Sequence, residues 1–319
     1  MDDGGRFPRV LVLGGTGFIG RHAVASLLES GCEVVIGSRH PSRIARRLPG
    51  LAARCGFRHA RLERLLEPAT WLPLLDGIDV VLNCVGILRQ RGRETYRRVH
   101  HLAPAALAAA CRLAGVRLVH VSALALRVGA RSRFLRSKLA GEEALRASGA
   151  DWRIVRPSLL DGDGGYGAKW LRRVARWPVH LLPADATGRI AALHVADLGD
   201  ALARIALLPA DPAASADARI YELGGLDCHT LAGYLVLLRQ QCGASPPLRL
   251  RVPSLLARLG SHLLDVLHLT PFSFGHWELL REDNCPRVNR LPELLGRAPR
   301  PLGPLTASPF PLALGPASA

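Results

Sequence analysis

A glycine-rich loop near the start of the chain is the feature that most limits how this sequence can fold. Gly14, Gly17 and Gly20 form the pattern GxxGxxG, directly after the apolar run 10–13 and at the start of an apolar segment. In such a loop the first glycine permits a tight turn, the second lets phosphates approach the backbone, and the third lets the next helix pack closely. The helix N-terminus supplies free N–H groups for the phosphates. The strand–loop–helix context therefore predicts a Rossmann-type site for a nicotinamide dinucleotide.

The first half of the chain alternates short apolar runs with helical patterns. We expect strands at 10–13, 33–37, 57–62, 79–85, 116–122 and 151–156, and helices at 19–30, 41–48, 94–114 and 132–148. Strands that alternate with helices form parallel sheets covered on both faces. The pattern predicts an α/β fold with a Rossmann-type doubly wound parallel sheet, and we assign residues 1–158 to it.

The second half is less regular and predicts a smaller, mostly helical C-terminal lobe over 159–300. We expect helices at 166–177, 231–241, 253–267 and 274–281, and strands at 189–194 and 220–223. Segments near 189–205 and 219–225 are expected to pack back on the Rossmann domain. Residues 301–319 are rich in proline and alanine, which predicts a loose tail.

Charge and cysteine content limit the partners. The formal net charge is +16, and Lys138 and Lys169 are the only lysines. Such a chain attracts anions such as nucleotides and acidic lipid surfaces. No zinc finger, recognition helix or aromatic RNA-binding motif is present, which disfavours nucleic acid. The seven cysteines are scattered without a CxxC pair, which predicts free thiols in a reducing compartment and no metal site.

The start of the chain is acidic, and no stretch is long and uncharged enough to cross a bilayer. We expect a cytoplasmic protein, with peripheral association at the inner face of a membrane left open.

The end of the second expected strand bears on the choice of dinucleotide. An NAD site usually carries an acidic residue there, which binds the ribose 2′-hydroxyl. This chain has none, and Ser38, Arg39 and Arg43 could hold a 2′-phosphate instead. The pattern favours NADP(H), while NAD(H) stays open. The alternative is that both arginines are ordinary solvated side chains.

Several further motifs follow the glycine loop in a fixed order. They are Asn83-Cys84-Val85-Gly86-Ile87, Val119-His120-Val121-Ser122-Ala123-Leu124, Ser137-Lys138-Leu139-Ala140-Gly141-Glu142, Trp152-Arg153-Ile154-Val155-Arg156-Pro157-Ser158, His194-Val195-Ala196-Asp197 and Leu279-Leu280-Arg281-Glu282-Asp283-Asn284. With the loop, they resemble an atypical short-chain dehydrogenase/reductase of the NAD-dependent epimerase/dehydratase type, from residue 10 to about 295. The branch most similar to this chain contains the nucleotide-binding accessory subunit of respiratory complex I and its bacterial relatives.

The resemblance implies a role for each matching residue. A serine at the end of the fifth strand orients a carbonyl, and a tyrosine four residues before a lysine transfers the proton. Here Ser122 and Lys138 match, but Phe134 stands at the tyrosine position and cannot transfer a proton. The cofactor-binding positions implied by the loop and the resemblance are Gly14, Thr16, Gly17, Phe18, Ile19, Gly20, Ser38, Arg39, Arg43, Cys84, Val85, Gly86, Lys138 and Pro157.

Three functions remain open at this stage. The first is an NADPH-binding protein with weak or no activity, linked to the respiratory chain or to quinone metabolism. The second is an active NADPH-dependent reductase or epimerase with a relocated proton donor, for which His120, Tyr96, Tyr166 and His194 are candidates. The third is a regulatory protein that senses NADP(H).

One expected helix suggests a contact surface. Lys169, Arg172, Arg173 and Arg176 share one helical face, and Trp170, Val174 and Trp177 share another. A basic face beside a tryptophan-bearing apolar face is typical of interfacial helices. The segment could be a lid or a contact with an anionic membrane surface or a membrane protein complex. The alternative is an amphipathic helix packed by its tryptophans.

Overall fold

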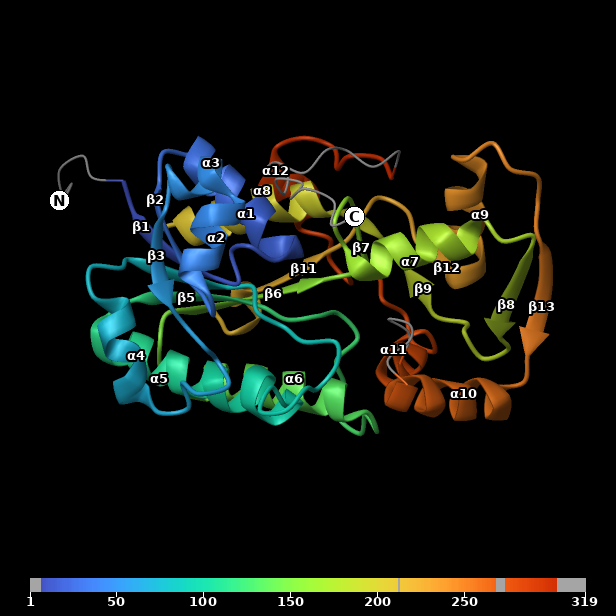
Figure 1. Cartoon of the computed structure of the whole chain (residues 1–319), viewed down its shortest axis with the longest axis horizontal. Coiled ribbons are helices and arrows are strands. Elements are labelled where there is room, and N and C mark those ends of the chain that lie inside the picture. Colours follow the sequence, from blue (N-terminus) through green and yellow to red (C-terminus); the bar gives the residue numbers. More distant parts are fainter. Residues whose placement is uncertain (1–6, 212, 268–272, 303–319) are drawn as a thin grey trace.

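A seven-stranded parallel sheet forms the centre of the molecule (Figure 1). The computed structural model describes residues 7–211, 213–267 and 273–302. The strands are β1 (Arg9–Leu13), β2 (Glu33–Ser38), β3 (Gly56–His59), β4 (Val80–Asn83), β5 (Arg117–Val121), β6 (Trp152–Pro157) and β11 (Ile220–Leu223). Their order is β11-β6-β5-β4-β1-β2-β3, so the winding direction reverses between β1 and β4. The predicted doubly wound Rossmann-type fold is confirmed, and this reversal is where such sheets bind ligands.

Helices cover both faces of the sheet. One face carries α1 (Phe18–Glu29), α8 (Val195–Leu207) and α12 (Leu291–Leu295), with α2 (Pro41–Arg47) and α3 (Pro49–Ala52) nearby; the other carries α4 (Pro68–Leu75), α5 (Ala103–Ala114) and α6 (Arg133–Ala147). Strand β1 shows why two layers form. Val10 and Val12 pack into the α1 and α8 core, whereas Leu11 and Leu13 pack into the α4 and α5 core. Successive strand residues face opposite sides, so a continuous apolar run serves both cores.

Two local features differ from the sequence expectation. The long helix expected at 94–114 begins as a π-helical segment, η1 (Arg97–Leu102), and continues as α5. Helix α4 was not expected, because prolines start and interrupt it. Its Trp71 is fully buried and donates a hydrogen bond to the carbonyl of Leu65 at 3.0 Å. This tertiary burial offsets the local cost of an internal proline.

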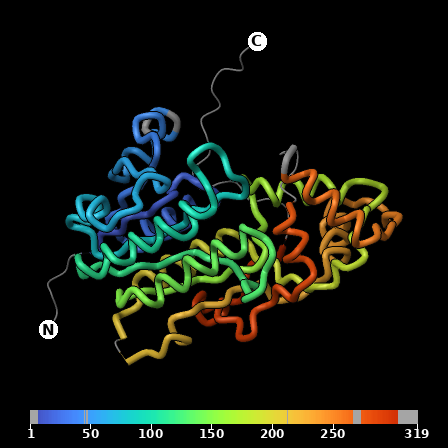
Figure 2. The backbone as a smooth tube through the Cα atoms, turned by 90° about the horizontal axis from the view of Figure 1, so that it is seen from below, coloured from blue at the N-terminus to red at the C-terminus, as the bar shows by residue number. Residues whose placement is uncertain are grey.

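The remaining elements gather at one end of the sheet (Figures 1 and 2). They are α7 (Tyr166–Ala175), α9 (Leu231–Gln240), α10 (Ser254–Leu267), α11 (Phe274–Leu279) and three strand pairs: β7 (Leu160–Asp161) with β10 (Leu193–His194), β9 (Arg189–Ile190) with β12 (His229–Thr230), and β8 (Val179–Pro183) with β13 (Leu248–Val252). The strand expected at 189–194 is thus two short strands, and the β8–β13 pair was not expected. The short helix η2 (Asp217–Arg219) instead lies at the start of β6, where Arg219 Cζ is 5.8 Å from the centroid of the Trp152 ring. Figure 2 views the molecule from the α5 and α6 side, where these helices run side by side along the sheet.

The expectation that all cysteines are free is wrong for one pair. Cys228 and Cys285 form a disulfide across a sequence separation of 57, while the other five are free. Close packing brings the two segments together. The side-chain amide of Asn289 donates hydrogen bonds to the carbonyls of Gly224 and Gly225, at 2.9 and 3.1 Å. No sequence spacing marks such a pair.

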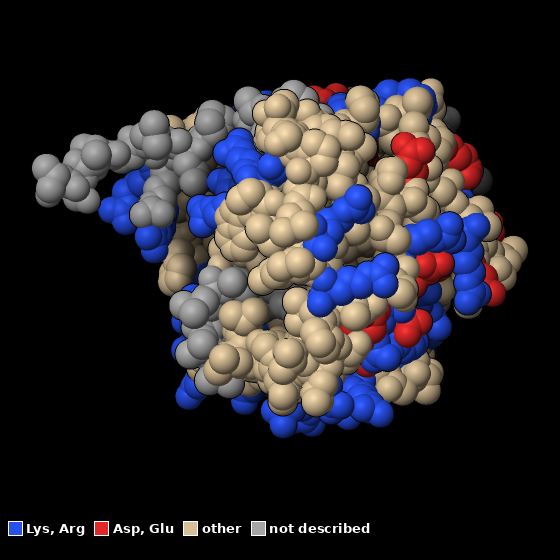
Figure 3. Space-filling model, turned by 90° about the vertical axis from the view of Figure 1, so that its right-hand side faces the viewer, with Lys and Arg blue, Asp and Glu red and all other residues tan. Residues whose placement is uncertain are grey.

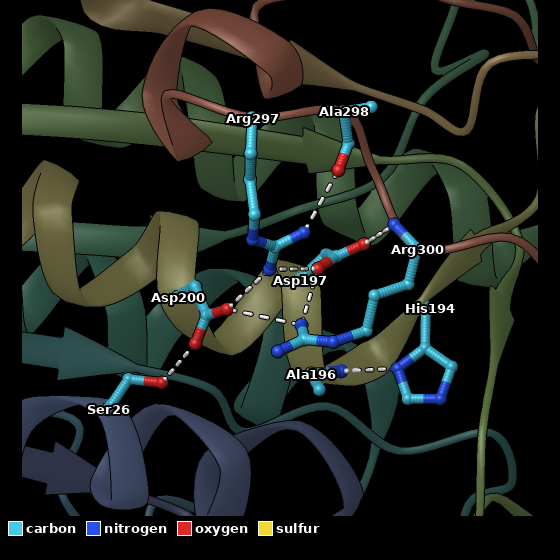
Figure 4. Close-up of polar contacts among 8 residues, drawn as sticks. All are labelled: Ser26, His194, Ala196, Asp197, Asp200, Arg297, Ala298 and Arg300. Atoms are coloured by element: carbon cyan, nitrogen blue, oxygen red, sulfur yellow. Dashed lines mark hydrogen bonds and ion pairs between the residues drawn. The ribbon is translucent and has the colours of Figure 1, made fainter. Parts of the chain in front are cut away.

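The C-terminal segment returns to α8 through a cluster of ion pairs (Figure 4). Asp197 is fully buried, and its carboxylate accepts hydrogen bonds from the Arg297 guanidinium and the Arg300 backbone, both at 2.6 Å. Both arginines also reach Asp200, which Ser26 of α1 contacts at 2.7 Å. The chain is therefore pinned as far as Arg300, and nearly all of the expected loose tail lies outside the described residues. No helix in the described part of the chain is long and apolar enough to cross a membrane.

Candidate functional site

The glycine loop has the geometry that a dinucleotide requires. Gly14 has φ +75°, and its carbonyl accepts a hydrogen bond from the Gly17 N–H at 2.8 Å. A Cβ on Gly20 would lie 2.2 Å from the Gly14 oxygen, so α1 packs directly on the turn. Gly17 precedes α1, and no side chain caps this helix. Thr16, Gly17, Phe18 and Ile19 remain partly accessible, which leaves the N-terminus of α1 open to an anion.

The loop after β4 lies against the glycine loop, across the reversal point of the sheet. A Cβ on Gly14 would be 3.0 Å from the Val85 side chain and 3.5 Å from the Cys84 carbonyl. Buried Asn83 holds this second loop in place, because its side-chain oxygen accepts a hydrogen bond from the Val85 N–H at 3.1 Å. The structure thus brings Cys84 and Val85 beside Gly14, whereas a Cβ on Gly86 would face the His100 Nε2 at 3.9 Å.

His100 is a site residue that sequence reasoning missed. Its Nε2 accepts a hydrogen bond from the Ile87 N–H at 3.0 Å, so its Nδ1 carries the proton and donates to Ser137 Oγ at 3.1 Å. Burial, followed by the charge of Lys138, holds the pKa of His100 well below its usual value. The neutral ring therefore ties the loop after β4 to α6.

Gly141 was the only sequence signal that α6 packs against the segment that carries His100. A Cβ there would lie 2.0 Å from the His100 carbonyl oxygen, so only glycine lets α6 pack so closely on η1.

Lys138 lies part-buried on α6, between these contacts and the sheet. Burial lowers the pKa of Lys138 from 10.5 to about 8, and Glu142 opposes this shift. Glu142 is itself fully buried and accepts a hydrogen bond from Arg156 Nε of β6 at 3.0 Å. This ion pair anchors α6 to β6, and the ammonium of Lys138 makes no hydrogen bond to another described residue.

Ser122 follows β5 and has an unsatisfied side chain. Its N–H donates to the Val155 carbonyl at 2.7 Å, but its buried hydroxyl has no partner among the described residues. A buried hydroxyl without a partner is costly, which fits a site that a ligand completes. Pro157 ends the neighbouring strand, where its carbonyl accepts from the Leu124 N–H at 3.1 Å.

His120, two residues earlier, is not a suitable proton donor. Its Nδ1 lies 3.1 Å from the Asn83 amide nitrogen, and burial followed by the charge of Lys138 lowers its pKa to about 3. The ring is neutral at physiological pH.

Phe134 stands in an aromatic cluster rather than in a proton-transfer network. Its ring centroid lies 5.5 Å from that of His100, 5.7 Å from that of Tyr96 and 6.0 Å from that of His276. The Lys138 Nζ is 5.9 Å from the same centroid, so these two residues, four apart in the sequence, lie side by side in the structure.

A cleft of about 450 Å³ opens on this cluster. Phe134, Tyr96, Arg89, Arg131, Arg133, Arg136, His262, Asp265 and Phe274 are among the residues that line it. The Tyr96 hydroxyl donates to the Leu88 carbonyl at 2.8 Å, and burial raises the pKa of this hydroxyl. Neither the glycine loop nor Ser122 lines the cleft.

The residues expected to hold a 2′-phosphate follow β2. The Gly14 N–H donates to the Gly37 carbonyl at 3.2 Å, so this strand end adjoins the glycine loop. Ser38 Oγ accepts a hydrogen bond from the His40 N–H at 3.2 Å, and Arg43 is exposed on α2. Arg39 forms an ion pair with Glu94. Its guanidinium must therefore share its charge with that carboxylate when a phosphate is present.

Helix α7 departs from the expected contact surface. Arg172 does not face solvent, because it forms an ion pair with buried Asp161, with Nε 3.1 Å from Oδ1. Trp170 and Val174 pack into a core with Tyr234 of α9. The expectation of one free basic face is wrong for Arg172, because its guanidinium neutralises the buried carboxylate of Asp161. The alternative of an amphipathic helix packed by Trp170 fits better, although Trp177 is exposed.

Comparison with known proteins gives the chain its family. The NAD(P)H-binding family matches residues 14–175, which is the region that carries the glycine loop, Ser122 and Lys138. The chain belongs to this family of atypical short-chain dehydrogenases/reductases.

The described residues hold no group of acidic, cysteine and histidine side chains that could bind a metal.

The chain is similar to two curated relatives and to one solved structure. A ceramide reductase from Caulobacter vibrioides is 33% identical over 192 residues, which cover 59% of this chain and 57% of that protein. The mitochondrial NADH dehydrogenase [ubiquinone] 1 alpha subcomplex subunit 9 of Dictyostelium discoideum is 26% identical over 80% of this chain and 70% of its own length. The structure of an NADPH-dependent quinone oxidoreductase from Escherichia coli with NADPH has a TM-score of 0.67 at 20% identity, over 92% and 96% of the two chains.

This chain spans little more than half of the ceramide reductase. The likeness to the quinone oxidoreductase concerns the fold.

Proposed function

We propose that this protein binds NADP(H) at the reversal point of its sheet. The observation that carries the proposal is the glycine loop, whose helix N-terminus is uncapped and whose Gly14 touches the loop after β4. The N–H groups of Gly17, Phe18 and Ile19, with Thr16, would hold the pyrophosphate. Arg39, Arg43 and Ser38 would hold the adenosine 2′-phosphate, and Lys138 the nicotinamide ribose, with Cys84, Val85, Gly86 and Pro157 lining the groove. NAD(H) is the competing ligand.

The bound cofactor would supply a hydride, but the protein would lack a good donor for the proton that the reduced carbonyl requires. Ser122 has a free hydroxyl to orient a carbonyl, but Phe134 has no proton to deliver. We therefore propose weak or absent turnover. A role next to the respiratory chain or quinone metabolism is supported by the name of one relative, an NADH dehydrogenase subunit.

A working reductase with a relocated donor is the second candidate, and one observation favours Tyr96 as that donor. Tyr96 lines the cleft and packs against Phe134. The other candidates are less suitable. His120 is neutral and bonded to Asn83, His194 Nδ1 accepts from the Ala196 N–H, and Tyr166 is exposed at the start of α7. Titration of NADPH and NADH, together with turnover on a panel of carbonyls and quinones, separates the two candidates.

Cofactor preference should depend on the Arg39–Glu94 pair. Arg39→Ala should weaken NADPH binding by about ten- to a hundredfold and leave NADH nearly unchanged, because a charge-assisted contact to phosphate is lost. Glu94→Gln should act in the opposite direction, because it frees the guanidinium for the phosphate. Fluorescence titration with both nucleotides measures the change. A wild type that prefers NADH, or an Arg39→Ala variant with unchanged preference, would contradict the assignment.

We expect Lys138 to lower the free energy of unfolding and, at the same time, to contribute to NADPH binding. At pH 7 the folded chain holds a partly buried ammonium whose pKa is about 8 instead of 10.5. Lys138→Met should therefore raise the free energy of unfolding at pH 7, by roughly 1–3 kcal/mol after allowance for partial exposure. The same variant should bind NADPH about tenfold more weakly.

The stability difference between Lys138→Met and the wild type should depend on pH. Between pH 8 and 10.5 the unfolded chain keeps a proton that the folded wild type has lost, so wild-type stability rises with pH in this window. The advantage of Lys138→Met should be complete below pH 8 and fade above it. Urea unfolding of both proteins at neutral and alkaline pH measures it. A variant that is less stable than wild type at pH 7 would refute the prediction.

A further inference from the structure

Helix α10 presents its apolar side to solvent. Leu255, Leu256, Leu259 and Leu263 are 66, 58, 58 and 58% exposed. Their spacing places them along one face of the helix. A helix on a soluble surface normally turns its leucines inward, and contiguous exposed apolar faces mark sites of interaction.

The opposite side of α10 is firmly held, so the exposed leucines do not result from a loosely placed helix. Asp265 forms an ion pair with Arg89 of the loop after β4, and its carboxylate accepts a hydrogen bond from the Phe274 N–H at 2.9 Å. The His262 ring stacks on that of Phe274 with centroids 4.3 Å apart, and Ser261 is fully buried. These contacts fix which face points outward.

A second exposed apolar group lies at the same end of the molecule (Figure 1). Leu250 of β13 pairs in register with Leu181 of β8, and both are exposed, as is Leu248. Residues paired in register, and residues two apart on a strand, share one face. Residue 253 alone separates β13 from α10, so the two leucine groups are continuous along the chain.

The chain segment that carries the leucines of β13 and α10 is basic. Arg249, Arg251 and Arg258 are all exposed, and no aspartate or glutamate occurs from residue 228 to 264. Arg249 and Arg251 alternate with Leu248 and Leu250, so they lie on the other side of β13, whereas Arg258 stands beside the leucines of α10.

Two acids of other segments, Asp185 and Glu278, line a hollow with Leu255 and Arg258. Both are paired, with Arg281 at 3.1 Å and with Arg127 at 3.5 Å. Figure 3 views this end of the molecule and shows uncharged surface beside lysine and arginine, with acidic residues gathered toward one side. Leucines beside an arginine, with the nearby acids already paired, are complementary to an anionic lipid surface, which offers both hydrocarbon and phosphate.

We propose that the leucines of α10, β13 and β8 bind an anionic lipid bilayer at the boundary of headgroups and acyl chains, with Arg258 on the phosphates. The leucines stand on a helix and on a two-stranded sheet, and a fluid surface can meet both. The inner side of α10 supplies His262 and Asp265 to the 450 Å³ cleft. Binding through this face therefore holds the cleft next to the lipid surface, and it does not depend on the bound nucleotide.

Co-sedimentation with vesicles tests the proposal on the full chain. We expect binding to phosphatidylcholine vesicles that contain phosphatidylglycerol, and at least roughly tenfold weaker binding to phosphatidylcholine alone or at high salt. Leu259→Ser with Leu263→Ser should reduce binding by at least about tenfold, and Arg258→Gln should reduce it by about fivefold. The matched control is Leu113→Ser, because Leu113 is 71% exposed on α5, away from this face. Thermal unfolding and NADPH titration check that each variant remains folded.

The outcomes are separable. Loss of vesicle binding in both face variants but not in Leu113→Ser supports the proposal. Wild-type protein that fails to bind anionic vesicles overturns it, as does equal binding by the leucine double variant. Light scattering on the same samples tests whether a second copy of the chain binds to this face instead. If the wild type self-associates through these leucines and does not bind vesicles, the face joins two copies of the chain and the lipid proposal is wrong.

Discussion

Phe134→Tyr should increase the rate of NADPH-dependent carbonyl or quinone reduction by ~10²–10⁴-fold, the usual contribution of a positioned general acid. Hydride transfer to a carbonyl leaves an oxyanion that needs a proton, and the wild-type ring has none to give. The ring already lies 5.9 Å from Lys138 Nζ, and Ser122 has an unpartnered hydroxyl. A tyrosine hydroxyl near the lysine charge would have a lowered pKa, which makes it a better acid. Steady-state turnover on a panel of substrates measures the gain.

Two controls make this result interpretable. Phe134→Leu removes the ring without adding a hydroxyl, so it should gain nothing. Both variants should bind NADPH as the wild type does, because the proposed cofactor contacts are unchanged. Ordinary enzymatic rates in the wild type would contradict the weakly active interpretation. Loss of those rates in Tyr96→Phe would then identify Tyr96 as the donor.

Gly17→Val should reduce NADPH affinity by at least about a hundredfold, because the side chain would occupy the place where the phosphates approach the backbone. The fold should survive. Gly17 has φ −75°, which valine adopts, and a Cβ would meet only the Gly14 oxygen, at 3.1 Å. Gly20 is unsuitable for this test, because its Cβ would collide with the turn itself.

Gly50→Val provides the matched control. Gly50 is exposed, and a Cβ there would meet nothing within 4 Å, so any general cost of valine for glycine appears without effect on the site. Calorimetric titration with NADPH and thermal unfolding of both variants complete the experiment. Equal affinity of Gly17→Val and wild type would show that the nucleotide does not bind at the glycine loop.

The fold was predictable because its signals are local. Apolar runs of strand length alternate with helical segments, and the glycine spacing reports a turn that only a few conformations satisfy. Phe134 could also be placed against Lys138 from spacing alone, since residues four apart on a helix share a face. Periodicity reports which face of an element is buried, which is enough to predict layers and a parallel sheet.

The structure added contacts that join distant segments. Arg39 meets Glu94, which is 55 residues away, and Cys228 meets Cys285. Arg172 turns inward to Asp161 although its helical face was expected to be free, and the leucines of α10, a segment expected only as a helix, turn outward. Periodicity reports that a helix has an apolar side, but whether that side meets a core depends on what the rest of the chain leaves beside it.

The sequence alone therefore determined the parallel sheet and the glycine loop, since the signals for both lie in short runs of neighbouring residues. The partners of His100, Arg39, Arg172 and α10 were decided by tertiary structure. Their energies come from burial and from pairing of charges that approach only once the sheet has closed and the helices have packed.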